Sequence, residues 1–580
     1  MAAQLNQPPL VVESKDVYDA VVVGSGVSGG WVAKELTERG LKVLMVERGR
    51  MVRHREDYPG ENKRPWELDH RDRVPLKEVE EQHSVQRLCY AFKDTTKQFF
   101  GNDRDLPYST EEGTDYAWIR ANQFGGKSLL WARQSYRMSD HDFGANAADG
   151  IDGDWPIRHA DLAPWYAHVE RFAGIAGSKE NLPQIPDSEF IPPFEMMKPE
   201  IAAKAAIEAK YPDRKVIIGR TANLSQPTEL HIAQGRGKCM AREECHRGCS
   251  FGASFSTQSV TLPPAAKTGN LHIAPNSVVH SLIYDEADNR VRGVRVIDNE
   301  TLAEREYFGK MVFLCASTLG STQVLLNSKS PSRPNGIANS SGVTGHFLMD
   351  HNYGADASGS LPGFEDEYFK GRRPTGIYIP NFQYEPSRYR PHYKRGYALG
   401  GGAYRGANWQ GGEWQDGLGA DYKKLLGQAG SWGLNFYFQG ETLSLRDNQV
   451  SLHPTKKDKW GIPQLHFNVR WSVNEQRMAE DAVVEMEAML RTAGAVDINA
   501  TLRPEPPGLA IHEVGSARMG RDPKTSVLNG WNQSHDVPNL FVTDGASFCS
   551  TGTQNPSLTF MALSARAADY AARELANQRL

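Results

Sequence analysis

The stretch "VYDAVVVGSGVSGGWVAKELTERGLKVLMVERG", residues 17–49, decides the fold of this 580-residue chain. Its apolar run at 18–23 is rich in valine, as expected of a buried parallel strand. A glycine turn follows, and apolar residues then recur at helical spacing up to Gly40, which suits a helix end. A second apolar strand ends at Glu47. The order strand, turn, helix, strand predicts a βαβ unit.

The turn has the pattern G-x-G-x-x-G at Gly24, Gly26 and Gly29. Such glycines allow a tight turn and a close approach to a pyrophosphate, whose charge faces the N-terminus of the following helix. Glu47 ends the next strand, where a carboxylate accepts hydrogen bonds from ribose hydroxyls. The unit therefore predicts a dinucleotide site. It does not separate FAD from NAD, and a glycine turn without a ligand is the alternative.

The composition is that of an ordinary globular protein. The formal net charge is −4, with 23% charged and 39% hydrophobic residues, which is ordinary for a globular protein and favours no nucleic-acid partner. We find no run of eighteen apolar residues, so no membrane span is expected. The start of the chain lacks the pattern of a secretory signal. Six cysteines are too few for a disulfide scaffold in a chain of this length. The length of 580 residues favours two domains or one large discontinuous domain.

Four further segments resemble the glucose–methanol–choline (GMC) flavin oxidoreductases. They are "NQFGGKSLLWARQSYR" (122–137), "LCASTLGSTQVLL" (314–326), "HEVGSARMG" (512–520) and "NLFVTDGASFCSTGTQNPSLTFMALSARAA" (539–568). The resemblance implies an FAD-binding Rossmann-like domain assembled from residues 14–150, 230–352 and 500–580. It also implies a substrate-binding domain from 151–229 and 353–499, whose antiparallel sheet roofs the flavin. The short alternating runs at 353–470 are compatible with that roof.

The resemblance also implies site residues. His512 and Asn555 occupy the positions of the catalytic pair that lies over the flavin ring. A neutral imidazole suits removal of a hydroxyl proton, and an amide hydrogen-bonds the same oxygen without changing charge. The flavin would accept the carbon-bound hydride. Further residues implied to border the FAD are Gly125, Gly126, Ser128, Val279, Asp544 and Gly545. For Asp544 a turn residue, and for Val279 an ordinary strand valine, are the alternatives.

One departure concerns the attachment of FAD. Some relatives tether it through a histidine just before the tryptophan of the "GG…W" segment, whereas this chain has Leu129-Leu130-Trp131. Leucine cannot form that bond. We therefore expect FAD to be bound non-covalently.

The segment "GKCMAREECHRGCSF", residues 237–251, contains Cys239, Cys245 and Cys249. A zinc site with His246 as fourth ligand, a disulfide with one thiol left over, and three unrelated thiols are alternatives. Thiolates are also the normal ligands of iron–sulfur clusters. The trio resembles the cluster-containing sugar dehydrogenases of the GMC family, which implies a [3Fe–4S] cluster that passes electrons singly to a cytochrome c-type acceptor. The other three cysteines are predicted to be small buried apolar residues.

Aromatic residues among glycines favour a mono- or disaccharide or glucoside as substrate, although packing within a sheet explains them equally well. They are Trp409, Trp414, Trp432, Tyr404 and Tyr437. Gln439 and Glu441 alternate on one predicted strand, so both would face one side as hydroxyl partners, or as a solvated face.

The motifs together resemble most the catalytic subunit of glucoside 3-dehydrogenase, which implies oxidation of the C3 hydroxyl. The alternatives are an FAD glucose 1-dehydrogenase, an oxygen-using pyranose or glycoside oxidase with structural cysteines, and an electron-transfer subunit without alcohol chemistry. The resemblance implies a small partner subunit whose signal exports the chain to the periplasm; a cytoplasmic enzyme is the alternative.

Overall fold

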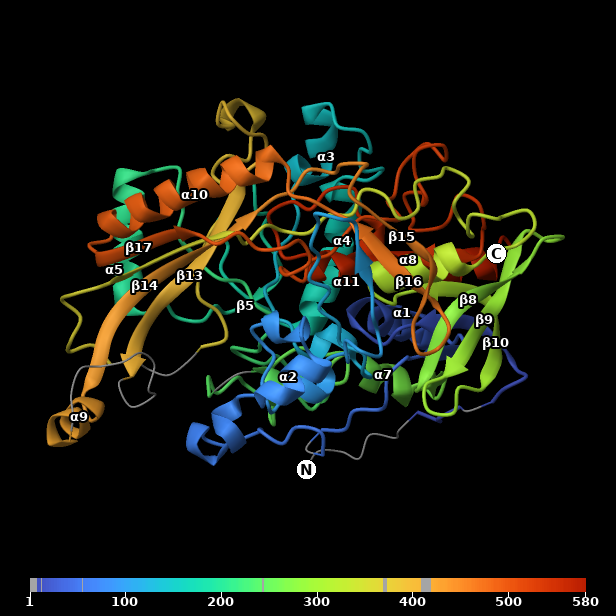
Figure 1. Ribbon diagram of the computed structural model, residues 1–580, viewed down its shortest axis with the longest axis horizontal. Helices are drawn as coiled ribbons and strands as arrows, with labels where there is room; N and C mark the ends of the chain where they lie inside the picture. The colour runs from blue at the N-terminus through green and yellow to red at the C-terminus, as the bar shows by residue number, and fades with distance from the viewer. Residues whose placement is uncertain (1–7, 12, 55, 243–244, 369–372, 408–418) are drawn as a thin grey trace.

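The computed structural model describes residues 8–11, 13–54, 56–242, 245–368, 373–407 and 419–580. Its two largest sheets lie side by side along the long axis of the molecule, each with its own helices (Figure 1). The first has the mixed order β7-β2-β1-β10-β9-β8 with β18 beside β10, and the second is a six-stranded sheet. This is the predicted combination of a Rossmann-like sheet and an antiparallel sheet.

The first sheet forms around the βαβ unit predicted from the sequence. Its parallel strands are β1 (Val17–Val23), β2 (Val43–Val46), β7 (Leu271–Ala274), β10 (Glu304–Leu314) and β18 (Leu540–Val542). The antiparallel strands β8 (Ser277–Asp285) and β9 (Arg290–Asp298) extend it. Helix α1 (Val27–Glu38) packs between α7 (Leu262–Lys267) and α11 (Ser557–Ala576), and α11 also packs on α4 (His159–Ala173). Strands distant in sequence therefore meet at one sheet.

The second sheet has the order β17-β11-β14-β13-β12-β6, and every pair in it is antiparallel. Its strands are β6 (Ile217–Ile218), β11 (Ala355–Ser360), β12 (Ile377–Ile379), β13 (Tyr397–Ala407), β14 (Ala429–Gly440) and β17 (Val496–Leu502). Helices α10 (Val473–Thr492) and α5 (Lys198–Lys210) contribute apolar side chains to the core on one face of the sheet. The opposite face of this second sheet is turned toward the cavity described below.

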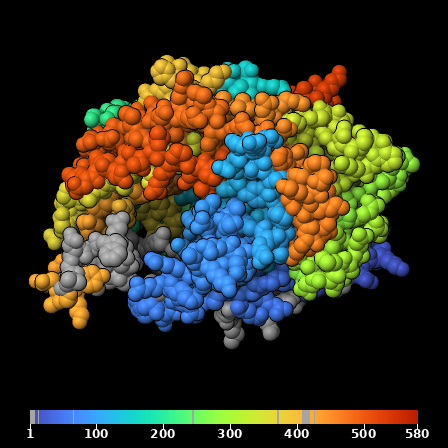
Figure 2. All heavy atoms as spheres, in the orientation of Figure 1, coloured from blue at the N-terminus to red at the C-terminus, as the bar shows by residue number. Residues whose placement is uncertain are grey.

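Smaller elements connect the two sheets. Strand β16 (Pro463–Asn468) pairs with β15 (Gln449–Lys457) and with β3 (Ser109–Thr110), and β4 (Ile175–Ala176) pairs with β5 (Phe190–Ile191). The remaining α-helices described are α2 (Leu76–Gln82), α3 (Asp140–Asp149), α6 (Glu229–Ala233), α8 (Thr318–Asn327) and α9 (Gly419–Leu426). In the space-filling view, a hollow opens between the strands of the second sheet and the segment around residues 50–100 (Figure 2). Among the described residues, we find no helix with both the length and the hydropathy to cross a bilayer.

The predicted domain boundaries stay a prediction, and two elements bear on them. Helix α4 lies in the segment 151–229 assigned to the substrate-binding domain, yet Leu162 and Tyr166 pack in the core of the first sheet. Strand β17 belongs to the second sheet but runs across the predicted boundary at 499/500. A boundary drawn by packing would move both elements.

Candidate active site

One cavity of about 710 Å³ extends from the carboxyl ends of β1, β2 and β10 to the second sheet. Ligands of open α/β sheets bind at such strand ends. Most of the predicted site residues line it: Gly24, Gly26, Glu47, Gly126, Ser128, Val279, His512, Asp544, Gly545 and Asn555. The predicted residues Gly29, Gly125, Gln439, Glu441, Cys239, Cys245 and Cys249 are not among its lining residues. The cavity therefore joins the predicted dinucleotide turn to the predicted catalytic pair.

The glycine turn has two crowded positions and one open position. At Gly24, with φ +100°, a Cβ would lie 2.4 Å from the Cys315 carbonyl oxygen. At Gly29 a Cβ would lie 1.9 Å from the Gly24 carbonyl oxygen. At Gly26 a Cβ would meet no described atom within 4 Å, although this residue lines the cavity. Gly24 and Gly29 thus allow the turn to form, while Gly26 leaves space for a ligand.

Three helix N-termini reach the cavity wall. They belong to α1, α8 and α11, and no described side chain caps any of the three by a hydrogen bond. Free N–H groups and the helix dipole attract anions. The donor set therefore suits a diphosphate, and the residues present fit a dinucleotide such as FAD.

Glu47 ends β2 and braces the glycine turn. Its carboxylate accepts hydrogen bonds from the backbone N–H groups of Ser25 (3.0 Å) and Gly49 (2.9 Å), and from the Ser25 hydroxyl (2.5 Å). Burial raises the pKa of Glu47, against these hydrogen bonds. Glu47 also lines the cavity, where a ribose could reach it. Its predicted contact with a ribose stays a prediction.

A second glycine turn packs on the first. Gly125 and Gly126 have φ of +104° and +52°, and the Gly125 N–H donates to the Ser25 hydroxyl at 2.8 Å. The Ser128 hydroxyl donates to the Gly125 carbonyl at 2.6 Å. A Cβ at Gly126 would lie 3.4 Å from the Cα of Gly26. The backbones of the two glycine turns therefore pack closely, and the predicted contact of Gly125, Gly126 and Ser128 with FAD stays a prediction.

Asp544 follows β18 and holds the next turn. Its carboxylate accepts the Ala546 N–H at 3.0 Å and the Ser321 hydroxyl at 2.5 Å, and burial raises its pKa to about 6. A Cβ at Gly545 would lie 2.4 Å from the Thr318 hydroxyl oxygen. Asp544 is thus a turn residue and also a cavity residue, and its predicted place beside FAD stays a prediction.

His512 and Asn555 face each other across the cavity wall. The Asn555 amide nitrogen lies 3.3 Å from His512 Nε2. Burial, followed by the neighbouring His351 ring and the Lys127 charge, holds the pKa of His512 well below its ordinary value. The imidazole is therefore neutral at neutral pH, which is the form that accepts a proton.

The segment 350–351, not singled out from the sequence, packs behind this pair. His351 Nδ1 lies 3.1 Å from His512 Nδ1. The Asp350 carboxylate accepts the backbone N–H groups of His512 and His351, each at 2.9 Å. Burial, and then the charge of Glu513, raises the pKa of Asp350 to about 8. No local pattern marks these residues, because they lie about 160 positions from their partner.

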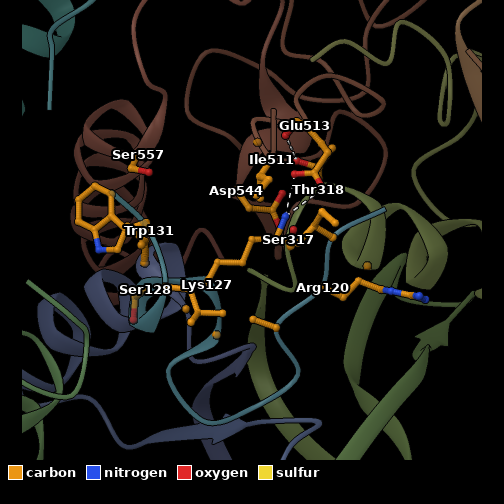
Figure 3. Close-up of a pocket in the computed structure, with 18 of the residues that line it drawn as sticks. Arg120, Lys127, Ser128, Trp131, Ser317, Thr318, Ile511, Glu513, Asp544 and Ser557 are labelled. Carbon is orange, nitrogen blue, oxygen red and sulfur yellow. Dashed lines mark hydrogen bonds and ion pairs between the residues drawn. The ribbon is translucent and has the colours of Figure 1, made fainter. Parts of the chain in front are cut away.

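A lysine also points into the site. Lys127 Nζ lies 2.9 and 2.8 Å from the two carboxylate oxygens of Glu513, and the Thr318 hydroxyl donates to the Glu513 carbonyl (Figure 3). Lys127 and Glu513 both line the cavity. Lys127 lies inside the predicted "GG" segment and Glu513 beside His512, but 386 positions separate them. The ion pair, in which two opposite charges offset each other, lies beside His512 on the cavity wall.

Aromatic rings close the cavity toward the second sheet. Tyr353 and Tyr437 line it, with ring centroids 5.9 Å apart, and the Tyr353 ring lies 6.0 Å from that of His512. Of the other aromatics considered from the sequence, Trp432 is buried in the sheet core and Tyr404 is 46% exposed. Trp409 and Trp414 lie outside the described residues. Only part of the predicted aromatic set thus reaches the cavity.

Gln439 and Glu441 follow Tyr437 at two-residue spacing, but other groups of the chain engage them. The Gln439 amide donates to the Thr553 carbonyl (2.7 Å) and accepts from the Tyr353 hydroxyl (2.7 Å). Glu441 forms a buried ion pair with Arg395 at 2.5 Å. Arg395, 0% exposed, also pairs with Asp149 at the end of α3. Neither side chain lines the cavity, so their predicted contact with substrate stays a prediction.

The three clustered cysteines lie on a loop that adjoins the cavity wall. Cys239, Cys245 and Cys249 are half-buried free thiols. Burial raises the pKa of Cys239 to about 11, and Cys245 and Cys249 are close enough to raise it further. His246 contacts the ring of Tyr90 at 6.5 Å between centroids, and Tyr90 lines the cavity. The loop and the cavity thus share one aromatic contact.

Within the described residues, we find no group of three His, Cys, Asp or Glu side chains close enough to hold a single metal ion. The zinc alternative therefore gains no support there. The donor set still fits a larger iron–sulfur cluster, because thiolates are the usual ligands of such clusters. Cys89, Cys315 and Cys549 are buried, as predicted.

Comparisons with known proteins agree with this geometry. Two models described as GMC oxidoreductase match residues 18–352 and 444–564. A 2-methyl-1,2-propanediol dehydrogenase of Mycolicibacterium austroafricanum is 29% identical over 97% of both chains. A fructose dehydrogenase large subunit of Gluconobacter japonicus is 26% identical over 96% of this chain and 98% of that one. The crystal structure of pyridoxine 4-oxidase from Mesorbium loti superposes with a TM-score of 0.58 at 17% identity, covering 96% of this chain and 99% of that chain, a likeness of fold.

Proposed function

Because the chain belongs to the GMC oxidoreductase family, FAD-dependent enzymes that act on CH–OH groups, we propose that it is a sugar dehydrogenase. It oxidises one hydroxyl of a glucose-type sugar or glucoside, at C3, to a 3-keto sugar. The observation behind the proposal is the arrangement of His512 and Asn555 between the glycine turns and the Tyr353–Tyr437 wall. Aromatic faces with nearby hydrogen-bonding groups suit a ring rich in hydroxyls.

The residues have distinct roles in this reaction. His512 accepts the hydroxyl proton at Nε2, and the Asn555 amide donates a hydrogen bond to the same oxygen. The hydrogen on carbon leaves as a hydride, so a C=O bond forms and two electrons leave the sugar. FAD, when bound, supplies the hydride acceptor. Asn555 also orients the substrate and stabilises negative charge on its oxygen as the proton leaves.

FAD would be held by the chain without a covalent bond. The glycine turn and the N-termini of α1 and α8 would hold the diphosphate, and Glu47 the ribose. Val279 borders the same part of the wall, and Asp544 and Gly545 border the path toward His512. Leu129 and Leu130 are buried and apolar, so this segment offers no nucleophile for a covalent attachment to the flavin.

The cysteine loop supports a route for electrons out of the site. We assign Cys239, Cys245 and Cys249 as ligands of a [3Fe–4S] cluster, which supplies a one-electron acceptor when bound. The loop lies against Tyr90 of the cavity wall, which favours this assignment over a structural role far from the chemistry. An oxygen-using oxidase would not need such a relay.

The cysteine assignment predicts iron content. Replacing Cys245 by serine is expected to remove the iron and acid-labile sulfide and to leave FAD bound, because Cys245 does not line the FAD cavity. Iron analysis together with the flavin absorbance measures both. Cys549→Ser is the matched control, since Cys549 is buried and does not line the cavity. Wild-type protein that is free of iron but fully active with a dye acceptor would contradict the assignment.

The substrate assignment predicts the oxidised carbon. Glucose and methyl α-glucoside are expected to give ketones at C3, whereas a C1 dehydrogenase converts only glucose, because the methyl group blocks the anomeric hydroxyl. Carbon-13 NMR of the products distinguishes a ketone from a lactone. 2-Methyl-1,2-propanediol serves as the non-sugar comparison. Turnover of the diol alone would overturn the proposed sugar substrate, and hydrogen peroxide as the main product would overturn the dehydrogenase.

Partners and compartment follow from the same proposal. One relative is named as a large subunit, which supports assembly of this chain with a smaller subunit. We propose that this subunit bears the export signal and takes the folded chain to the periplasm, where a cytochrome c-type protein accepts the electrons. A cytoplasmic location is the alternative. Co-purification and fractionation with a tagged chain distinguish them.

A further inference from the structure

A second buried histidine adjoins the catalytic pair and has no part in the mechanism described so far. His351 is 1% exposed and lies between His512 and the turn at Gly552. We propose that His351 is a positioning residue that fixes the ring proton of His512 on Nδ1 and so keeps Nε2 free to accept the substrate's hydroxyl proton. The proposal rests on alcohol oxidation and on the role of His512, and not on which sugar is oxidised.

The hydrogen bond of His351 to Gly552 determines which ring nitrogen of His351 bears the proton. Its Nε2 lies 2.8 Å from the carbonyl oxygen of Gly552, which only accepts hydrogen bonds, so Nε2 bears the proton. Burial lowers the pKa of His351 to about 4, so the ring is neutral and has one proton. Its Nδ1 is therefore a lone-pair acceptor.

The contact with His351 in turn determines which ring nitrogen of His512 bears the proton. Its Nδ1 lies 3.1 Å from His351 Nδ1, and an acceptor on His351 requires a donor on His512. The neutral His512 ring thus has its proton on Nδ1 and a lone pair on Nε2. The Asn555 amide nitrogen, 3.3 Å from that Nε2, is a donor and matches the lone pair until the substrate's hydroxyl takes its place there. The opposite tautomer would place two acceptors face to face at the Nδ1 atoms and two donors at Nε2.

The surroundings keep this arrangement in place. The rings cross at 86° with centroids 5.0 Å apart, and Asp350 binds the backbone N–H of both histidines. Gly552 has φ +61°, a conformation that favours glycine, and its carbonyl direction is set by that turn. When Nε2 accepts the hydroxyl proton, the Nδ1–H bond to His351 is retained, so the imidazolium forms without movement of the ring.

Two substitutions separate the two hydrogen bonds of His351. His351→Asn places its amide oxygen near the position of Nδ1, so it retains an acceptor for His512 but not the bond to Gly552. His351→Gln places its amide nitrogen near the position of Nε2, so it retains the bond to Gly552 but loses the acceptor. A role confined to holding the Gly552 turn predicts that Gln is the better replacement. The proposal predicts the reverse.

Flavin reduction provides the first readout. With the glucosides named above, or with whichever alcohol reduces the wild-type flavin, His351→Asn is expected to retain the rate of anaerobic reduction to within about 10-fold. His351→Gln is expected to lose about 100-fold or more, because the wrong tautomer removes the base. Equal losses in the two variants, or a larger loss for Asn, would overturn the proposal. Thermal unfolding and the ratio of flavin to protein absorbance verify that both variants fold.

Nitrogen-15 NMR of histidine-labelled holoenzyme tests the proton directly and needs no substrate. The His512 signals are identified by their absence in His512→Ala. In wild type we expect Nε2 to show the chemical shift of an unprotonated imidazole nitrogen and Nδ1 that of a protonated one. A protonated Nε2 in wild type would refute the proposal even if every alcohol tested were a substrate. The expected shift in a protein that oxidises none of the sugars would overturn only the proposed substrate.

Discussion

Replacing His512 by alanine is expected to slow anaerobic reduction of the flavin by substrate about 10²- to 10⁴-fold, the range for loss of a positioned general base. The cause is loss of the Nε2 lone pair beside the Asn555 amide. Stopped-flow absorbance measures this step separately from reoxidation. FAD content should be unchanged, because the glycine turns and the helix N-termini are untouched.

His453→Ala is the control for this experiment, because that imidazole lies on β15 and does not line the cavity. Its flavin should be reduced at the wild-type rate. A His512→Ala enzyme that also retains the wild-type rate would rule out His512 as the base. In that case, the third alternative considered from the sequence, an electron-transfer subunit, would regain support.

Two alanine substitutions in the glycine turn are expected to act on different properties. Gly26→Ala should leave a folded protein that loses FAD, because its Cβ meets no described atom within 4 Å and projects from the cavity wall. Gly29→Ala should destabilise the apo-protein by about 3 kcal/mol, since an overpacked atom against backbone cannot be relieved by a rotamer change. The contact responsible is 1.9 Å from the Gly24 carbonyl oxygen.

Thermal unfolding of the apo-proteins and flavin absorbance after purification measure the two effects. Gly144→Ala in α3 is the control, because a Cβ there meets no described atom within 4 Å and Gly144 lies outside the cavity wall. Wild-type affinity for FAD in Gly26→Ala would show that the diphosphate does not pass this turn. Equal stability of the Gly29→Ala and wild-type apo-proteins would contradict the close packing of the turn.

The parts of the molecule that sequence predicted well are those specified locally. The βαβ unit follows from alternation and glycine spacing within 33 residues, and the structure forms β1, α1 and β2 there. The antiparallel second sheet follows from short alternating runs. His512 and Asn555 were found because each lies in a recognisable motif, and the tail brings them within hydrogen-bonding distance.

The parts that sequence missed depend on which face of an element meets which partner. Alternation predicted that Gln439 and Glu441 face one side, but Gln439 donates to the Thr553 carbonyl and does not line the cavity, whereas Tyr437 lines it. Alternation contains no information on what covers a face. The sequence did not indicate His351 or Lys127 for a related reason. The partner of His351 is 161 positions away and that of Lys127 is 386 positions away, so no local pattern marks either residue.

The buried guanidinium of Arg395 affects where substrate can enter the enzyme and where product can leave it. It ties the start of β13 to α3 through Asp149 and Asn146, and to Glu441 at the end of β14. Separating one partner of a buried ion pair costs about 3–5 kcal/mol. The second sheet is therefore held to the rest of the molecule at this end. Opening is easier at other parts of the rim, which makes those parts, rather than the Arg395 end, the place to engineer a wider entrance for substrate.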